Sequence, residues 1–82
     1  MKLQVRDTYK YRFKVGNLVV HCGITNSLSR REYEHKNSGR YAVYNGKRYY
    51  WSKGHIVQVG LKVTRAAGLL WERQNGCNSN WN

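Results

Sequence analysis

Arg31 and His35 are the side chains whose types and spacing best suit chemistry on a phosphate group. They stand four residues apart in a segment, residues 28–36, that lacks glycine and proline and is predicted to be a charged helix. At that spacing both project from one helix face. A guanidinium can bind the phosphate, and an imidazole can handle a proton near neutral pH. The alternative is that both are ordinary residues of a solvated face.

Carboxylates that could hold a metal ion are scarce. Asp7 stands in the lead-in to the first predicted strand, and Glu32 and Glu34 lie among arginines on the helix 28–36, where ion pairs explain them. Glu72 remains, one helical turn after Gly68, which has no side chain to cover that face. The chain can therefore build a site with one divalent metal and one protein carboxylate, but no multi-carboxylate two-metal site.

Charge indicates the class of partner. The chain has 82 residues, enough for a single domain (1–82) with one modest core, and carries 15 Lys and Arg against 4 acidic residues, a net charge of +11. Polyanions are the natural partners of such a protein. Its 7 Tyr and 3 Trp, interspersed with the cations, suit stacking on bases. We expect nucleic acid as the partner: DNA, with RNA as the alternative.

Nothing in the sequence favours a membrane or secretion. The longest apolar stretch, residues 66–71, is too short to span a bilayer, and the N-terminus lacks the apolar core of a signal peptide. Cys22 and Cys77 are too few for a disulfide framework and show no zinc-finger spacing, although one disulfide is an alternative. We therefore expect an intracellular, cytoplasmic protein with reduced cysteines.

Periodicity predicts the elements that must position these residues. Residues 9–15 alternate apolar with basic side chains, as in a half-buried strand, and Gly16-Asn17 joins them to a second strand, 18–24. Residues 25–27 offer caps for the helix 28–36, and 37–39 end it. Asn45-Gly46 between aromatic arms predicts a second hairpin over residues 40–51.

The C-terminal part is predicted to add a strand and a helix. Residues 55–63 form the strand, with a bulge or bend at Gly60, and Thr64 caps a helix over 65–74. Ala67, Leu70 and Trp71 make an apolar stripe on that helix, and residues 75–82 are loop. The predicted fold is α+β: a small, mostly antiparallel three-stranded sheet flanked by helices, with an inserted β-hairpin.

Three segments together resemble the core of the GIY-YIG endonuclease family: Tyr9-Lys10-Tyr11, His21-Cys22-Gly23 and the run from Ile24 to His35. In that family one tyrosine lies on the first strand, and a second precedes a glycine on the second strand. An arginine follows that glycine after eight residues, with a histidine or tyrosine one turn further on. Gly23, Arg31 and His35 match this spacing. The segment from Gly68 to Glu72 is similar to the family's metal-binding segment.

The resemblance implies a metal-dependent endonuclease that hydrolyses phosphodiester bonds of DNA. Water would attack with the help of a tyrosine, Arg31 would bind the scissile phosphate, and Glu72 would hold Mg²⁺ or Mn²⁺. The catalytic tyrosine would be Tyr11, with Tyr9 as second choice. Because an unperturbed tyrosine has a pKa of about 10, Tyr11 would need nearby cations or a histidine to act as a base. The candidates for that help are Arg12, Arg31 and His35.

The sequence departs from the family pattern at several positions. Tyr9 and Lys10 replace the family's first glycine and isoleucine, and His21 stands where the second tyrosine is expected. A match shifted by two residues would put Gln74 in place of Glu72 and remove the metal ligand. Candidates for the asparagine that the family often uses after its last helix are Asn78, Asn80 and Asn82.

His21 shares a face with Tyr11 only in one register of the first hairpin. A two-residue turn would pair Val15 with Leu18 and put His21 on the side of Arg12. A catalytic role for His21 therefore predicts a loop of odd length.

Basic residues outside the catalytic set are expected to contact nucleic acid: Lys10, Arg12, Lys14, Arg30, Lys47 and Arg48. The hairpin 40–51 would be an arm that contacts the substrate, or else would only widen the sheet. A non-catalytic nucleic-acid-binding module is the main alternative function. One catalytic site cuts one strand, so the protein would act as a monomer or a homodimer.

Overall fold

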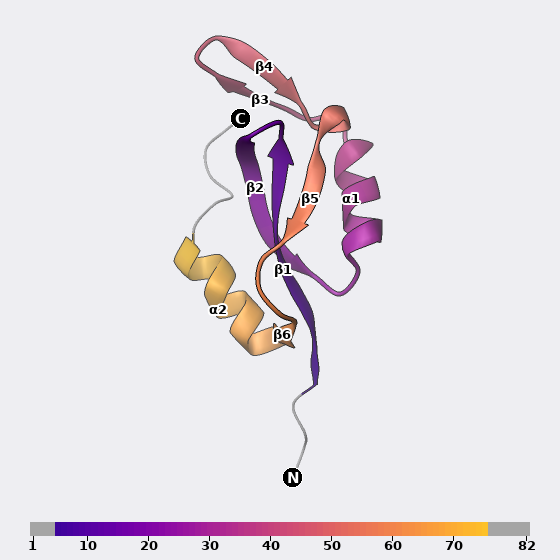
Figure 1. Ribbon diagram of the computed structural model, residues 1–82, viewed down its shortest axis with the longest axis vertical. Coiled ribbons are helices and arrows are strands. Elements are labelled where there is room, and N and C mark those ends of the chain that lie inside the picture. Colours follow the sequence, from indigo (N-terminus) through magenta and orange to yellow (C-terminus); the bar gives the residue numbers. More distant parts are fainter. Residues whose placement is uncertain (1–4, 76–82) are drawn as a thin grey trace.

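The computed structural model describes residues 5–75, which form an α+β domain around an antiparallel sheet (Figure 1). The central strand, β1 (Arg6–Val15), pairs with β2 (Leu18–Thr25) on one side and β5 (His55–Gln58) on the other. A short strand, β6 (Val63–Thr64), pairs with the start of β1. The predicted antiparallel sheet with flanking helices is confirmed, and β6 is an addition to it.

The β1–β2 hairpin combines a two-residue turn with a β-bulge. Val15 pairs with Leu18, so the loop is even in length, contrary to the prediction of an odd one. The register shifts between Phe13 and Lys14: Lys14 pairs with Val19, but Phe13 pairs with His21. Val20 is therefore an extra residue, and one extra residue returns the rest of β2 to the opposite face. The prediction that a two-residue turn removes His21 from the site is wrong because of this bulge.

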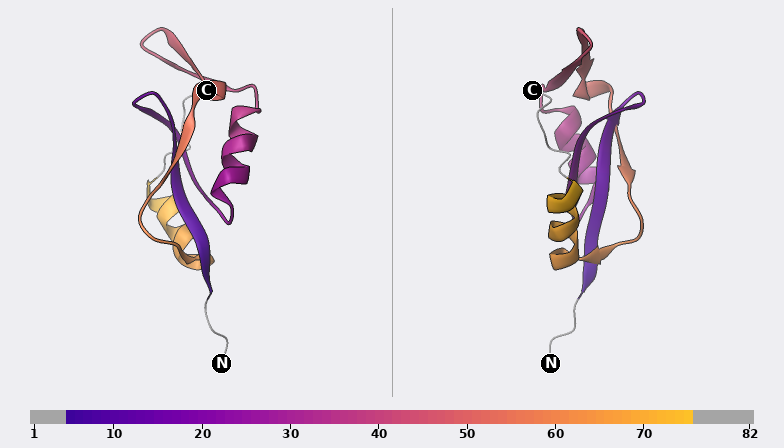
Figure 2. Two further views of the ribbon diagram at one scale, coloured as in Figure 1. Left: turned by 45° about the vertical axis from the view of Figure 1, so that its right-hand side comes forward. Right: turned by 90° about the vertical axis from the view of Figure 1, so that its left-hand side faces the viewer.

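The two helices begin where their caps predict. In α1 (Leu28–Lys36) the Ser27 hydroxyl accepts a hydrogen bond from the Arg30 amide at 3.4 Å. In α2 (Arg65–Asn75) the Thr64 hydroxyl accepts one from the Ala67 amide at 3.2 Å. Figures 1 and 2 show that the helices flank the sheet on different sides, with α1 beside β5 and α2 beside β2 and β6.

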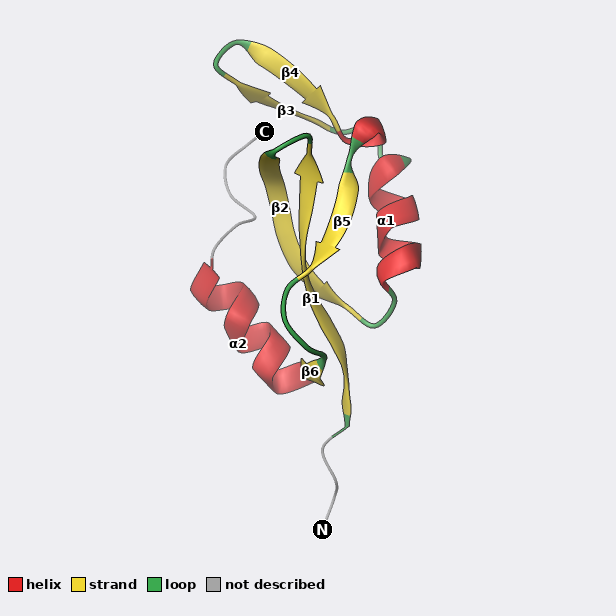
Figure 3. Cartoon of the chain, in the orientation of Figure 1, coloured by secondary structure: helices red, strands yellow, loops and turns green. Residues whose placement is uncertain are grey.

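The second hairpin stands apart from the main sheet. Its strands, β3 (Tyr41–Tyr44) and β4 (Lys47–Tyr50), pair only with each other among the described residues, and they extend beyond the tip of the β1–β2 hairpin (Figure 3). Asn45 and Gly46 have φ angles of 53° and 77°, as a type I′ turn requires. The alternative that this hairpin widens the main sheet is therefore wrong.

The strand predicted over residues 55–63 is two strands. The chain leaves β5 after Gln58, turns at Gly60 with a φ of 65°, and rejoins the sheet as β6. A left-handed φ favours glycine, which explains why the break falls there.

The core lies between β1, α1 and η1, a 3-10 turn (Trp51–Lys53) that follows β4. Helix α2 packs closely on the sheet through Gly68, where an added Cβ would lie 2.9 Å from the Thr8 methyl group. The predicted apolar stripe of α2 is largely wrong, because Leu70 is 52% exposed, Ala67 is exposed and Trp71 is half-buried. The buried apolar core side chains are Tyr11, Phe13, Val15, Val20, Ala42 and Trp51.

Cys22 is buried and disulfide-bonded, which corrects the expectation of reduced cysteines. The other cysteine, Cys77, lies outside the described residues, as do the candidate asparagines of the tail. Cysteine usage thus gives no support to the expected cytoplasmic location. Within residues 5–75 no helix has both the length and the apolar character needed to cross a membrane.

Candidate active site

Tyr11 and His35 meet at the centre of the candidate site. The Tyr11 hydroxyl forms a hydrogen bond with Nε2 of His35 at 2.8 Å. Tyr11 lies in the middle of β1 and is only 2% exposed, while His35 lies in the last turn of α1. The bond therefore connects the sheet to the helix that covers it.

Gly23 makes room for the Tyr11 ring. It pairs directly with Tyr11 across the β1–β2 hairpin. A Cβ at position 23 would lie 2.8 Å from the Tyr11 hydroxyl oxygen and 3.0 Å from Cζ, closer than side chains normally approach. The Tyr11 ring thus leaves no room for a side chain at position 23, which explains the glycine there.

A cluster of rings surrounds the Tyr11–His35 pair. The His21 ring lies 6.1 Å from Tyr11 and 5.1 Å from His35 between ring centroids. Trp51 lies 5.2 Å from His35 and 5.6 Å from His21. His21 is therefore brought to the predicted site, and the bulge at Val20 is what brings it there.

Burial keeps the titratable groups of this cluster neutral. Desolvation raises the pKa of Tyr11 to about 12, although the charge of Arg31 acts to lower it. Desolvation, the neighbouring His21 and the charges of Arg31 and Arg40 lower the pKa of His35 to about 4. The pKa of His21 is lowered for similar reasons, first by desolvation. At neutral pH the site contains a phenol and two neutral imidazoles.

Arg31 supplies the positive charge of the site. It precedes His35 by one turn of α1, and its charge affects the pKa of Tyr11 and of both histidines. Its Nε atom is buried without a hydrogen-bond partner among the described residues, while Nη1 pairs with Glu34 at 3.3 Å. The side chain is 36% exposed, so the outer part of the guanidinium can reach an anion from solvent.

Glu72 lies within electrostatic range of Tyr11 but does not touch it. Its carboxylate raises the Tyr11 pKa, with a larger effect than that of Glu34. Glu72 is half-buried one turn after Gly68, on the helix that packs against Thr8. Thr8 and Tyr11 alternate to opposite faces of β1, so α2, which packs against Thr8, and α1, which covers Tyr11, lie on opposite faces of the sheet.

The other predicted residues lie around this centre. Tyr9 is half-buried, and the Lys62 ammonium lies 5.7 Å from the centroid of its ring. Tyr11 is the tyrosine that bonds to His35, so it is the better placed of the two. Arg12 and its neighbours Lys10 and Lys14 alternate to the face opposite Tyr11. Arg12 is accordingly not among the groups that shift the Tyr11 pKa, contrary to its predicted role.

Cations on α1 and on the β3–β4 hairpin are exposed. Arg30 bonds to Asn26 at 3.0 Å and lies 3.9 Å from Glu34, which confirms the ion-pair interpretation of that glutamate. Lys47 lies over the Tyr49 ring at 5.4 Å, and Arg48 lies over Tyr41 at 5.1 Å.

Three contributors were not predicted. Trp51, assigned to the hairpin arm, is only 3% exposed and lies in the ring cluster. Arg40 lies over the Trp51 ring at 5.4 Å and lowers the pKa of both histidines. Glu32 accepts a hydrogen bond from the Ile56 amide at 2.9 Å, which fixes α1 to β5 instead of forming the predicted ion pair. The one sequence signal for the position of Trp51 is the tight Asn45-Gly46 turn before it, which predicts that the chain reverses direction.

No protein-family model, curated protein or solved structure matches this chain. The resemblance to GIY-YIG nucleases therefore depends on the spacing of residues in the sequence alone. The description of the site depends on the contacts given above.

Proposed function

We propose that this protein is a metal-dependent endonuclease that hydrolyses a phosphodiester bond of DNA. The observation that supports this most directly is the Tyr11–His35 hydrogen bond, which lies within electrostatic range of both a cation, Arg31, and a carboxylate, Glu72. Phosphodiester hydrolysis requires a cation for the phosphate, a group that handles the proton of water, and an anchor for a divalent metal.

The residues present fit a site with one Mg²⁺ or Mn²⁺ ion. No group of three His, Cys, Asp or Glu side chains in residues 5–75 could hold a metal alone. Magnesium is usually held by one or two carboxylates together with substrate phosphates and water. Glu72 would provide that carboxylate. When bound, the ion would offset the negative charge that develops on the leaving oxygen.

Arg31 would bind the scissile phosphate through the exposed part of its guanidinium, since its side chain is 36% exposed. Tyr11 would act as an orienting group, because a phenol with a pKa of about 12 is protonated at neutral pH. With its proton donated to neutral His35, the Tyr11 oxygen keeps lone pairs that can accept a hydrogen bond from the attacking water. With its own proton on Nδ1, neutral His35 accepts at Nε2, so as the water attacks, His35 can take the Tyr11 proton while the Tyr11 oxygen takes the proton of the water.

A non-catalytic nucleic-acid-binding module is the second candidate. The raised pKa of Tyr11 favours it over a mechanism in which an ionised Tyr11 is the base, because a phenol with a pKa of about 12 keeps its proton at neutral pH. In that case the ring cluster would be a structural core and the charges alone would bind nucleic acid.

Nicking of supercoiled plasmid DNA in Mg²⁺, Mn²⁺ or EDTA separates the two candidates. We expect nicking with either metal and none with EDTA. Glu72→Gln should abolish nicking with little change in DNA binding, since it removes the ligand but keeps the size of the side chain. Glu34→Gln is the matched control, because it removes a charge that also affects Tyr11 but is already paired with arginines. Full activity in Glu72→Gln would eliminate the metal assignment.

A further inference from the structure

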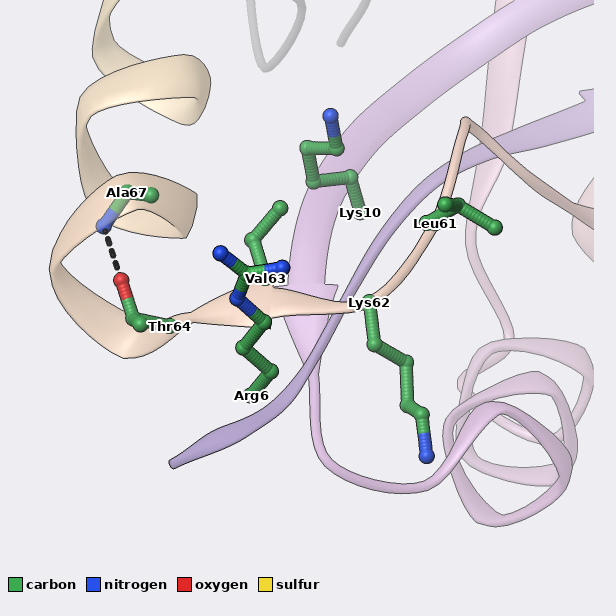
Figure 4. A pocket seen from close by; sticks show the side chains of 7 residues that line it. All are labelled: Arg6, Lys10, Leu61, Lys62, Val63, Thr64 and Ala67. Atoms are coloured by element: carbon green, nitrogen blue, oxygen red, sulfur yellow. Dashed lines mark hydrogen bonds between the residues drawn. The ribbon is translucent and has the colours of Figure 1, made fainter. Parts of the chain in front are cut away.

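A basic cavity lies beside the start of α2, away from the Tyr11–His35 pair. Its volume is about 410 Å³, and its walls come from the start of β1, from residues 61–64 and from the first turn of α2. Figure 4 shows the side chains of Arg6 and Lys10 extending in the same direction, while Lys62 extends the opposite way. Three cations therefore line this cavity, and two of them, Arg6 and Lys10, extend the same way.

No carboxylate within residues 5–75 forms an ion pair with Arg6 or Lys10. Among residues 5–75 the ion pairs are those of Arg30 and Arg31 with Glu34. The Lys10 ammonium lies 6.0 Å from the Trp71 ring centroid and close to Gly60, so its stem is held at the cavity wall. Two uncompensated cations in one hollow repel each other, and a bound anion would relieve that repulsion.

We propose that this cavity binds a non-scissile phosphate of the DNA backbone. The inference rests on the proposed function, because it assigns part of the nuclease substrate to the α2 side of the protein. From Thr64 to Glu72 the helix advances about 12 Å, at about 1.5 Å per residue. That distance is about three to four base steps along a B-form strand. The cavity would fix the direction in which the strand passes Glu72.

Two glutamate substitutions in the first turn of α2 test whether the positive charge of the cavity binds a phosphate. Ala67 lines the cavity, whereas its neighbour Ala66 does not, and both are exposed. An acidic residue near a helix N-terminus is favourable, so both variants should fold. We expect Ala67→Glu to weaken binding of a 20-base-pair duplex by about tenfold more than Ala66→Glu, because it places a carboxylate where the phosphate would bind.

Affinity should be measured in EDTA, so that no DNA is cut, over a range of KCl concentrations. The double variant Arg6→Gln/Lys10→Gln should lower the slope of log affinity against log salt by about 1.8, at about 0.9 for each lost phosphate contact. Lys36→Gln/Lys53→Gln removes the same charge outside the cavity and should change the slope by less. Equal slopes for the two double variants, or equal affinities for the two glutamate variants, would overturn the proposal.

Inorganic phosphate at constant ionic strength separates a DNA site from a site for free phosphate. Shifts of the amide signals of residues 61–67 with phosphate, combined with an unchanged DNA salt slope, would show a free-phosphate site and refute the backbone assignment. Failure of the nuclease proposal is distinguishable: the wild type would not nick plasmid, yet the contrast between the Ala67 and Ala66 variants would persist. A wild type that does not bind the duplex would refute both proposals.

Discussion

The Tyr11 hydroxyl lies 2.8 Å from Nε2 of His35, although the two residues are 24 positions apart in the chain. This contact depends on three others: Gly23 admits the ring, the helix cap at Ser27 sets the phase of α1, and the bond from Ile56 to Glu32 holds that helix against β5. A substitution at any of these positions should weaken the hydrogen bond between Tyr11 and His35.

Gly23→Ala should displace Tyr11. The new Cβ would lie 2.8 Å from the hydroxyl oxygen of a buried ring, so we expect a loss of stability of about 1–3 kcal/mol and loss of the hydrogen bond to His35. Chemical denaturation measures the first effect. The same substitution in a Tyr11→Phe background should cost less, since the nearest clashing atom is absent. Equal costs in both backgrounds would show that the hydroxyl contact is not the cause.

His35 should titrate far below the ordinary range for histidine. Its pKa of about 4 in the folded protein compares with about 6.5 in an unfolded chain. Between these values the unfolded state binds more protons, so stability should fall as the pH is lowered from about 6.5 to about 4 and be unaffected by His35 above that window. NMR of the imidazole Cε1 proton during acid titration measures the pKa directly. A value at or above 6.5 would contradict the described burial.

The sequence predicted the helix 28–36 and both hairpin turns because those signals are local: caps, Asn-Gly, and alternation. The bulge at Val20 was missed because it changes only how β2 pairs with β1 and has no residue type that marks it in the sequence. The sequence also misjudged α2, because the close contact of that helix with the sheet is made at Gly68, the buried residue of α2, while Leu70 remains exposed. Long-range packing of this kind has no periodic signal.

Tyr11→Phe should preserve folding and DNA binding but reduce nicking. The variant loses one hydrogen bond, worth about 1 kcal/mol, whereas it removes the proposed water-orienting oxygen. If activity requires the phenolate, the wild-type rate should increase about tenfold per pH unit up to the Tyr11 pKa of about 12, and Tyr11→Phe should lose that increase. If the two proteins nick DNA at the same rate at every pH, Tyr11 neither ionises nor orients water in the rate-limiting step.

Arg31→Ala should damage the chemical step much more than binding. One contact among many cations adds little affinity, whereas charge stabilisation in the transition state is worth roughly 3 to 4 kcal/mol, or about 100- to 1000-fold in rate. Arg30→Ala is the matched control, because it removes the same charge from the adjacent, exposed position. Single-turnover rates at saturating enzyme separate chemistry from affinity. Equal rate losses in the two variants would reduce Arg31 to a surface contact.

The β3–β4 hairpin should act as a substrate-contacting arm. The β3–β4 ribbon stands apart from the main sheet (Figure 1). Its Tyr41, Tyr44 and Tyr50 are each more than 40% exposed, and the cations of the arm lie over two of its rings. A two-stranded ribbon fits the major groove of B-form DNA, where cations meet phosphates and aromatic faces meet bases. The arm contributes no carboxylate, so its role would be binding and not metal chemistry.

Lys47→Ala/Arg48→Ala should therefore weaken DNA binding and lower the slope of log affinity against log salt by about 1 to 2, while cleavage at saturating enzyme stays near the wild-type rate. Lys47→Arg/Arg48→Lys keeps both charges and should retain the wild-type slope, which distinguishes lost charge from disturbed packing on Tyr49 and Tyr41. An unchanged slope in the alanine variant would make the arm structural. A collapse of the saturated rate would instead place it in the catalytic machinery, because a residue that only binds cannot limit chemistry once the substrate is fully bound.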